Sequence, residues 1–459
     1  MKSEIKYSKL TKKYEKPLME NLKGLVAINS TYDEKTIDEK NPFGQGVTNA
    51  LKFFEDLARK DGFKVTNYDN KVVEAIVGEG KKNITIMAHA DIVPVGTGWS
   101  QDPFQVVEKK GVVYGRGVAD DKGPLLSCYY GLLALKENNL LGKYRVRFLV
   151  GGNEESGSLC MEHYFHTLKK EAPTYGFSPD SDFPVVFAEK GIMNFEVKKK
   201  VNVPGLLSLS GGTAPNSVIE LCTVRYEINN DIIPFLVKNF PDAEVLTRDD
   251  IVNITFHGKA AHGSTPQLGV NAGMRAMKFL ADYTKNKDLQ KFVDCYSDVY
   301  GKGCHATGYS HDMGQNSLNV GLIDYQDEII TMIVNFRFVE TCEPVDLKSN
   351  IVENSRPLSV KFLGYSPLLY FKKDSPLIKT LVNAYRAETG DTKTEPLAIG
   401  GGTYAKETSN VVAFGLEYPG WDSKMHSVGE QIRVDALNQG MAIYARAIHD
   451  LGKLIENEN

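Results

Sequence analysis

The chain has 459 residues, of which 42% are hydrophobic and 24% charged, and its formal net charge is -4. This length favours more than one hydrophobic core in a globular protein, while the small negative charge gives no electrostatic reason to expect nucleic acid or an anionic membrane as partner. No apolar run reaches the length of a membrane helix, about 18 residues, and the charged start has no signal-peptide apolar block, so we expect no membrane partner.

The first third of the chain alternates helical and extended patterns. Apolar residues recur at helical spacing over residues 47–58, and Gly62 stands where a C-cap would end that helix. A second helix is predicted over residues 124–137, with proline in its first turn. The predicted strands are residues 64–68, 72–77, 83–88 and 144–152. This alternation predicts an α/β domain with a mostly parallel central sheet.

The pattern changes near residue 198. From there to about residue 370, alternating segments are mixed with helices such as residues 272–283, and after residue 374 the earlier style returns. We therefore predict an α/β domain formed by residues 1–192 and 376–459, interrupted by an inserted α+β domain at residues 193–375.

The segment HADIVPVG begins where the strand at residues 83–88 ends. In open α/β sheets, ligands bind at the carboxyl ends of the strands. His89 and Asp91 are two residues apart, so in an extended chain they face the same side. Asp91 can then hold one imidazole nitrogen while the other binds a metal. The alternative is a buried pair in which the two side chains only satisfy each other.

Two further segments, GRGVADDKGP and GGNEESGS, each contain adjacent carboxylates. A turn with an N-cap explains one of Asp120 and Asp121 but not both. Glu154 and Glu155 would repel each other unless a cation or a proton separates them. A metal site can use one as ligand and the other as general base, whereas the alternative is a solvated helix start.

Two more candidates lie downstream, Asp180 in SPDSDFP and His426 in KMHSVGE. Together with the earlier segments, they make the chain resemble the co-catalytic di-zinc exopeptidase family of aminoacylase, acetylornithine deacetylase, carboxypeptidase G and bacterial dipeptidase V. The segments that appear in family order are HADIVPVG, GRGVADDKGP, GGNEESGS, SPDSDFPV, AHGSTPQ, IGGGTYA and the final MH. The sequence is most similar to the dipeptidase V branch, of Xaa-His dipeptidase type, through GVADDKGP, SPDSDFP, the EKG at 189–191 and IGGGTYA.

The resemblance implies that the α/β domain is catalytic and binds two zinc ions. The implied metal ligands are His89, Asp120, Glu155, Asp180 and His426. Asp120 would bridge both ions, Asp91 would orient His89, and Glu154 would be the general base; the bond from Asp120 to Asp121 is cis in relatives. Two dications bring a charge of about +4, and three carboxylates with one bridging hydroxide bring about -4, so the site would be near neutral. Carboxylates and imidazoles suit zinc but also admit manganese or cobalt.

The inserted domain resembles the family's lid. His262 in AAHGSTPQ would reach the scissile carbonyl and stabilise its oxyanion, and Asn216 in TAPNSV would contact substrate. Arg337 in NFRFV could hold a C-terminal carboxylate bidentately. The remaining implied contacts are with Gly401, Gly402 and Thr403, where backbone could approach that carboxylate. Taken without the resemblance, these would be a surface-loop histidine, an ordinary strand arginine and a flexible turn.

We expect hydrolysis of unblocked dipeptides by a water or hydroxide that bridges two zinc ions, with Glu154 moving the proton. The alternative is a deacylase of N-acyl amino acids, because the same metal core serves both reactions. A non-catalytic metal-binding module is disfavoured by the intact Glu154 beside Glu155. A nucleotide-binding oxidoreductase is weaker still, because no GxGxxG follows a first strand.

The expected partner is a small peptide, with no nucleic acid and no membrane. By analogy with relatives that have a longer lid, we expect a monomer whose lid imitates the pairing of shorter relatives. The six cysteines are scattered without CxxC spacing, which favours free thiols and a cytoplasmic location.

Overall fold

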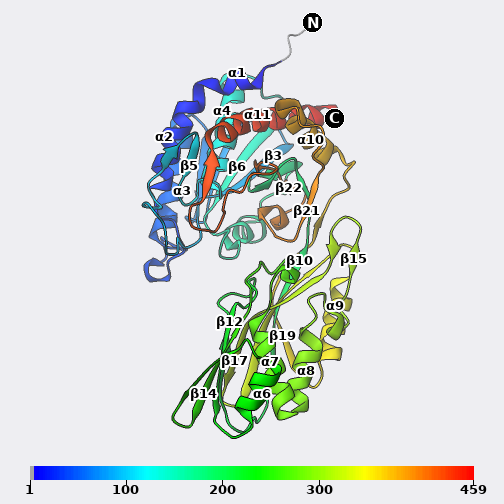
Figure 1. The fold of residues 1–459 in the computed structure, drawn as a ribbon. Coiled ribbons are helices and arrows are strands. Elements are labelled where there is room, and N and C mark those ends of the chain that lie inside the picture. The colour runs from blue at the N-terminus through cyan, green and yellow to red at the C-terminus, as the bar shows by residue number, and fades with distance from the viewer. Residues whose placement is uncertain (1–4, 459) are drawn as a thin grey trace. The chain divides into compact units, whose positions relative to one another are not determined.

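The structure is a computed structural model that describes residues 5–458. The chain forms two compact units (Figure 1). Unit 1 comprises Met1–Ala188, Phe371–Leu397 and Thr403–Asn459, within the described range, and unit 2 comprises Glu189–Tyr370 with Ala398–Gly402. No helix in the described range is both long and apolar enough to cross a membrane.

Unit 1 is built on a mixed sheet with the strand order β1-β2-β6-β3-β7-β22-β9. These strands are β1 (Lys64–Tyr68), β2 (Val72–Gly78), β3 (Asn83–His89), β6 (Arg145–Gly151), β7 (Tyr175–Ser178), β9 (Val186–Glu189) and β22 (Val411–Ala413). The central pairs β6/β3, β3/β7 and β7/β22 are parallel, whereas β1/β2, β2/β6 and β22/β9 are antiparallel. The predicted α/β class is confirmed; the parallel arrangement holds in the centre of the sheet and ends toward both edges.

The helices of unit 1 include α4, an apolar segment that is buried along almost its whole length. They are α1 (Tyr7–Thr11), α2 (Glu15–Val26), α3 (Gln45–Lys60), α4 (Lys122–Glu137), α5 (Leu159–Glu162), α10 (Pro376–Thr389) and α11 (Val434–Asn457). Helices α4 and α11 pack side by side (Figure 1). Gly131 permits this contact, because a Cβ there would lie 2.7 Å from the carbonyl oxygen of Met441. A helix that is apolar on all sides is expected in such a buried layer.

Two small strand groups connect distant parts of unit 1. One is a sheet of β4 (Val107–Lys109), β5 (Val112–Tyr114) and β24 (Gln431–Arg433), in which β5 is central. The other pairs β8 (Ser181–Asp182) with β23 (Leu416–Glu417). The sheet of β4, β5 and β24 brings the segment after Tyr114 beside the segment before Gln431, although more than 300 residues separate them.

Unit 2 has an antiparallel sheet with the strand order β13-β14-β12-β11-β17-β18-β10-β19. The strands are β10 (Gly191–Lys200), β11 (Leu206–Gly211), β12 (Leu221–Glu227), β13 (Glu244–Arg248), β14 (Ile251–His257), β17 (Ser317–Gln326), β18 (Ile329–Phe338) and β19 (Ser359–Ser366). Buried and exposed residues alternate along β12 and β14, as expected for a sheet with one covered face. The short strands β15 (Tyr309–Ser310) and β16 (Gly314–Gln315) form a separate hairpin, and β20 (Leu369–Tyr370) and β21 (Leu397–Ile399) fall where the chain passes between the units.

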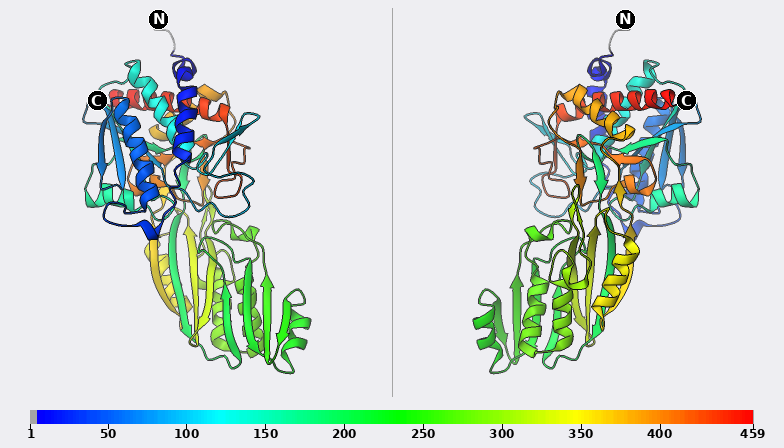
Figure 2. Two further views of the ribbon diagram at one scale, coloured as in Figure 1. Left: turned by 90° about the vertical axis from the view of Figure 1, so that its left-hand side faces the viewer. Right: turned by 90° about the vertical axis from the view of Figure 1, so that its right-hand side faces the viewer.

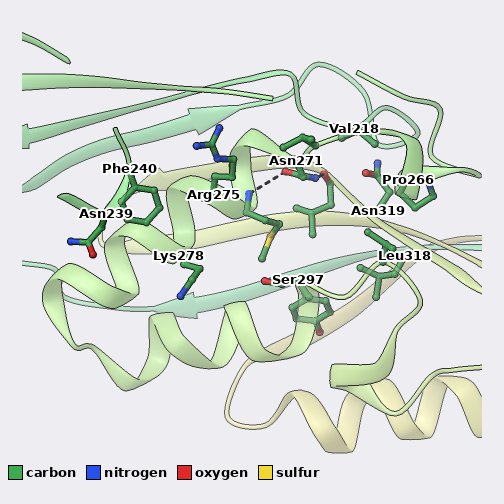
Figure 3. Close-up of a pocket in the computed structure, with 16 residues that line it drawn as sticks. Val218, Asn239, Phe240, Pro266, Asn271, Arg275, Lys278, Ser297, Leu318 and Asn319 are labelled. Atoms are coloured by element: carbon green, nitrogen blue, oxygen red, sulfur yellow. Dashed lines mark hydrogen bonds between the residues drawn. The ribbon is translucent and has the colours of Figure 1, made fainter. Parts of the chain in front are cut away.

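The helices of unit 2 lie against one face of its sheet (Figure 2). They are α6 (Ile232–Asn239), α7 (Ala272–Thr284), α8 (Lys287–Tyr296) and α9 (Pro344–Ser355). Apolar side chains from the sheet and from these helices form one buried cluster. Asn271 precedes helix α7 and caps it, because its side chain accepts the N–H of Met274 at 3.1 Å (Figure 3). The insert is therefore an α+β unit with its own core.

Candidate metal centre

The candidate centre of unit 1 lies at the carboxyl ends of three parallel strands. His89 is the last residue of β3 and pairs in register with Gly151, the last residue of β6. Glu154 and Glu155 come three and four residues after Gly151, and Asp180 comes two residues after β7. Because these strands run in parallel and are neighbours, their following residues meet at one edge of the sheet.

Two groups of possible ligands share one carboxylate. The first consists of His89, Asp120 and Asp180, and the second of Asp120, Glu155 and His426. Nε2 of His89 lies 3.0 Å from Oδ1 of Asp120 and 3.7 Å from Oδ2 of Asp180. Nε2 of His426 lies 2.8 Å from Oδ2 of Asp120 and 3.2 Å from Oε1 of Glu155. The two oxygens of Asp120 therefore face two different imidazoles.

The imidazole of His89 is oriented through its other nitrogen. Nδ1 donates to the backbone carbonyl of Asp91 at 3.0 Å, and the Asp91 carboxylate is 3.4 Å away. Because a carbonyl oxygen and a carboxylate can only accept, Nδ1 carries a proton, and in the metal-free protein Nε2 carries one as well and donates to Oδ1 of Asp120 at 3.0 Å. The N–H of His89 donates to Oδ2 of Asp121 at 3.0 Å. The peptide bond from Asp120 to Asp121 is cis.

His426 reaches the group from a loop and is the most accessible of the five. Its side chain is 57% exposed, whereas that of His89 is fully buried. The backbone of His426 has φ 60°, in the left-handed region that residues other than glycine adopt rarely and often at functional sites. The exposed side of the centre is therefore at His426.

Burial and neighbouring negative charges raise the pKa of three carboxyl groups. Burial and then the neighbouring charge of Asp120 raise the pKa of Glu155 and that of Asp180 to about 7. Burial and then Asp180 raise the pKa of Glu154 well above its usual value. Several anions this close together need a proton or a cation between them.

The pKa values of Asp120 and His426 are both shifted toward the charged form, downward for Asp120 and upward for His426. Burial opposes ionisation of Asp120, but hydrogen bonds from His426 and His89 outweigh it and hold its pKa well below the usual value. The adjacent carboxylates of Asp120 and then Glu155 raise the pKa of His426 to about 11. In the metal-free protein, the imidazolium of His426 thus neutralises part of the acidic charge.

The donors fit divalent metal ions. Oε1 of Glu155 is buried and makes no hydrogen bond to any described residue, although it faces Nε2 of His426. A buried carboxylate oxygen without a donor is costly, and a cation would satisfy it. Carboxylate oxygens with imidazole nitrogens form a donor set used by zinc and by related transition metals.

The substrate-contact candidates of the inserted segment lie in unit 2. Nδ1 of His262 lies 2.6 Å from Oγ of Ser264, and the neighbouring residue Gly263 donates its N–H to the carbonyl of Asn216 at 2.7 Å. His262 and Asn216 are both exposed and lie on adjacent segments. The guanidinium of Arg337 is buried in unit 2 and donates to the carbonyl of Gly400.

The glycine run of IGGGTYA has two different kinds of position. At Gly400 a Cβ would lie 2.5 Å from Cβ of Ser264, so only glycine fits. At Gly401 the nearest neighbour would be 3.6 Å away, which leaves room for a side chain. Gly402 is exposed in unit 2, and Thr403 is buried in unit 1, where its hydroxyl accepts the N–H of Ala405 at 3.2 Å.

Unit 2 also contains a cavity of about 440 Å³ beside α7, lined by Phe240, Met274 and Leu318 among others (Figure 3). None of its lining residues is histidine, cysteine, aspartate or glutamate. Its two cations are paired, Arg275 with Asp242 at 2.6 Å and Lys278 with Asp282 at 2.8 Å. The cavity therefore holds no group suited to metal binding or proton transfer near neutral pH.

Sequence reasoning missed two residues that border the centre, Arg116 and Glu430. Both are buried, and their side chains lie 2.7 Å apart. Arg116 is part of GRGVADDKGP and Glu430 is the last residue of KMHSVGE, so each lies in a segment that had already attracted attention. A glutamate in a loop is ordinarily solvated, and only the fold places this one inside.

The comparisons with known proteins agree with this geometry. A family profile described as Peptidase family M20/M25/M40 matches residues 85–450. A Staphylococcus epidermidis protein named "Putative dipeptidase" is 34% identical over 465 residues, covering 95% of this chain and 97% of that protein. The chain therefore belongs to Peptidase family M20/M25/M40, and it is a hydrolase of the metal-dependent peptidase class.

Solved structures of low sequence identity share the fold. Human carnosine dipeptidase 1 superposes with a TM-score of 0.58 at 14% identity, covering 97% of this chain and 99% of that chain. The dipeptidase Dug1p of Saccharomyces cerevisiae has a TM-score of 0.59 at 15% identity, with coverages of 97% and 98%. These likenesses confirm the predicted combination of a catalytic α/β domain with an inserted α+β domain.

Proposed function

We propose that the protein hydrolyses unblocked dipeptides with two zinc ions, which His89, Asp120, Asp180, Glu155 and His426 would hold. The observation that carries this proposal is the position of Asp120, whose two oxygens lie 3.0 and 2.8 Å from Nε2 of His89 and of His426. A carboxylate in that position can bridge two ions. When bound, such ions lower the pKa of a water and polarise the scissile carbonyl.

Glu154 is the proposed proton carrier. Burial and then Asp180 raise the pKa of its carboxyl, and a raised pKa makes its carboxylate a stronger base toward the attacking water. Its backbone N–H is held by Asp91 at 3.1 Å, which fixes the start of the side chain. Glu154 then gives the proton to the leaving amine, whose departure completes cleavage of the peptide bond.

The substrate contacts of unit 2 are proposed from their chemistry. His262 is exposed, with Nδ1 2.6 Å from Oγ of Ser264, and its imidazole could serve as a hydrogen-bond donor to an oxyanion. Arg337 is buried, and no described carboxylate forms an ion pair with it, so the C-terminal carboxylate of a dipeptide is a suitable partner. Asn216, Gly401, Gly402 and Thr403 would complete the contacts.

A second cavity in unit 2 supports the proposal that Arg337 binds the C-terminal carboxylate of the substrate. It has a volume of about 460 Å³ and is lined by Lys190, Ser264, Ser317 and Gly400, the residue that accepts from Arg337. Oγ of Ser317 is buried without a hydrogen-bond partner in the described structure. Hydroxyl and cationic donors at such a cavity suit an anionic or hydrogen-bond-accepting ligand.

The cellular setting is part of the proposal. All six cysteines are free thiols in the described structure, and five of them are buried. Free thiols are the rule in a reducing compartment, so we propose a cytoplasmic enzyme that acts as a monomer on small peptides.

The test is metal analysis of the purified protein combined with a substrate panel. We expect two equivalents of metal per chain and turnover of dipeptides such as Ala-Ala or Xaa-His, abolished by chelation and restored by Zn²⁺. N-acetyl amino acids serve as the matched comparison, because they lack the free amine. Faster turnover of the acetylated compounds would identify a deacylase, and activity that survives complete metal removal would overturn the proposed centre.

A further inference from the structure

The two segments that carry Asp120 and His426 are joined by one buried carboxylate, that of Glu430. Its Oε1 accepts the backbone N–H of Gly117 at 3.0 Å, of Ala119 at 2.9 Å and of Asp120 at 3.2 Å. Glu430 has no exposed surface. A carboxylate that accepts several amide N–H groups fixes the backbone that supplies them, so Glu430 determines where the Asp120 backbone lies.

The second oxygen of the same carboxylate binds Arg116. Oε2 accepts from Nη1 of Arg116 at 2.7 Å and from the N–H of Gly117 at 3.1 Å. Nη2 of Arg116 lies 3.4 Å from the carbonyl of Ser427, the residue after His426. Arg116 is 1% exposed and its guanidinium lies over the ring of Trp99 at 5.5 Å. The ion pair thus contacts both ligand-bearing segments at once.

The backbone next to Glu430 and the backbone next to Arg116 belong to the same small sheet. Strand β24 starts at Gln431, directly after Glu430, and pairs with β5, which ends at Tyr114. The N–H of Gly115 donates to the carbonyl of Glu430 at 3.2 Å. Gly117 has φ 88°, and a Cβ there would lie 3.0 Å from Ile92 and from Lys122, so glycine is needed for its N–H to reach Glu430.

From this arrangement we propose that Glu430, together with Arg116, is a positioning residue that sets the spacing between Asp120 and His426 and so determines the affinity of the metal centre. Neither side chain is among the possible ligands. Glu430 acts through the backbone N–H of Asp120, and Arg116 through Glu430 and the carbonyl of Ser427, next to His426. The inference rests on the proposed metal centre. An apolar pair could pack as well at this place in the fold as two buried charges do. The positioning role gives a physical reason why Glu430 and Arg116 are charged.

The test is Glu430→Gln in the full-length protein, titrated with Co²⁺ and with Zn²⁺. The variant replaces one oxygen by an NH₂ group that faces two donors, so the loop must shift. We expect metal affinity to fall about 10- to 100-fold, as for other partners that orient ligands. The ligand-field absorption of bound Co²⁺ should also change, and the circular dichroism spectrum should stay that of the wild type.

A matched control is Glu388→Gln in the same unit. Glu388 forms a mostly buried ion pair with Arg446 at 2.5 Å, and neither residue contacts the proposed ligands. We expect this variant to bind metal with wild-type affinity. If it lost as much affinity as Glu430→Gln, loss of general stability would explain both results and the proposal would be overturned.

A second variant, Arg116→Lys, carries the test if Glu430→Gln does not fold. Lysine keeps the charge and gives up the second contact, that to Ser427. We expect weaker binding of one metal equivalent. Wild-type affinity and an unchanged Co²⁺ spectrum in whichever of the two variants folds would refute the positioning role. Absence of metal binding by the wild-type protein would instead refute the proposed function itself.

Discussion

The backbone N–H of Glu154 donates to Oδ1 of Asp91 at 3.1 Å. The next N–H, that of Glu155, donates to Oδ2 of the same carboxylate at 3.1 Å. Asp91 also accepts from Nδ1 of His89 through its own carbonyl. One buried aspartate therefore orients the imidazole of His89 and the backbone of two adjacent glutamates.

Asp91→Asn should lower activity without unfolding the protein. The amide nitrogen of asparagine would face one of the two backbone donors, so the Glu154–Glu155 segment would move. We expect kcat to fall about 10- to 100-fold, as for other residues that orient metal ligands, measured as steady-state hydrolysis of a dipeptide at saturating metal.

Asp38→Asn is the matched control for that variant. Asp38 likewise accepts two successive backbone N–H groups, of Lys40 at 2.8 Å and of Asn41 at 2.7 Å, but in an exposed loop. Its kcat should equal that of the wild type. An unchanged kcat in Asp91→Asn would show that the two hydrogen bonds to Glu154 and Glu155 are irrelevant to catalysis.

The two adjacent glutamates should respond differently to the same substitution. Glu154→Gln removes the proposed proton carrier and leaves both ligand groups complete, so we expect two bound metal equivalents and a kcat about 100- to 10,000-fold lower. Glu155→Gln weakens a ligand group and should lose one metal equivalent. Metal content and kcat measured on the same samples decide the assignment; full activity in Glu154→Gln would exclude it as the base.

Metal affinity should rise steeply with pH up to about pH 7 and less steeply above it. The pKa of Glu155 and that of Asp180 are raised to about 7 in the metal-free protein. Below pH 7 an incoming dication must displace the protons of these carboxyls as well as that of His426, whose pKa is raised to about 11. Above pH 7 the carboxyl protons are already gone, so only the imidazole protons of His426 and of His89, whose pKa is also raised by its hydrogen bonds to Asp120 and Asp91, remain to be displaced.

The same carboxyls give the metal-free fold a stability contribution of defined sign. Because their folded pKa values are above the unfolded ones, the contribution is complete below about pH 4 and is lost as the pH rises through 7. The measurements are competition with a chelator of known pH dependence, and thermal unfolding of the metal-free protein between pH 5 and 8. Affinity that is independent of pH between 5 and 7 would contradict the raised pKa values.

Local patterns predicted most of the elements that form the centre. The strand predicted at residues 64–68 has those bounds in β1, and the strand at 83–88 extends by one residue to His89. The helix predicted from residue 124 begins two residues earlier, at Lys122, whose buried side chain donates to the carbonyls of Leu25 and Ile28. Periodicity detects these elements since it reports which face of each is buried.

Long-range pairing could not be predicted in the same way. Strand β2 joins β6 in antiparallel orientation, and β22 joins β9 likewise, which neither strand's own residues specify. The role of Glu430 depends on the pairing of β24 with β5, strands that are far apart in the sequence. Such contacts follow from the packing of the whole unit, and a single sequence carries no local signal for them.

Arg337→Lys should separate substrates by their C-terminal group. Lysine keeps the positive charge but cannot donate two parallel N–H groups to one carboxylate. A lost hydrogen bond to a charged group is worth about 1.5–3 kcal/mol, so kcat/KM for a dipeptide should fall about 10- to 150-fold. The corresponding dipeptide amide, which lacks the carboxylate, should be cleaved by both proteins at similar rates.

Arg275→Lys controls for the removal of a guanidinium from unit 2. Arg275 is paired with Asp242 at 2.6 Å, so no substrate carboxylate is needed to explain its charge. We expect unchanged kcat/KM for both substrates. If Arg337→Lys slowed cleavage of the dipeptide and of its amide equally, Arg337 would be a structural residue of unit 2.

Gly400→Ala and Gly401→Ala should differ in what they damage. The new methyl group at 400 would lie 2.5 Å from Cβ of Ser264, a distance that real Cβ atoms do not tolerate, so unit 2 must shift and its stability should fall by about 1–3 kcal/mol. At 401 the nearest atom is 3.6 Å away and the backbone is not in the left-handed region, so stability should be kept.

If the backbone at Gly401 approaches the substrate carboxylate closely, Gly401→Ala should raise KM while its thermal unfolding matches the wild type. Unchanged KM together with unchanged stability would remove Gly401 from the substrate contacts and leave Gly400 as a glycine that packing alone requires.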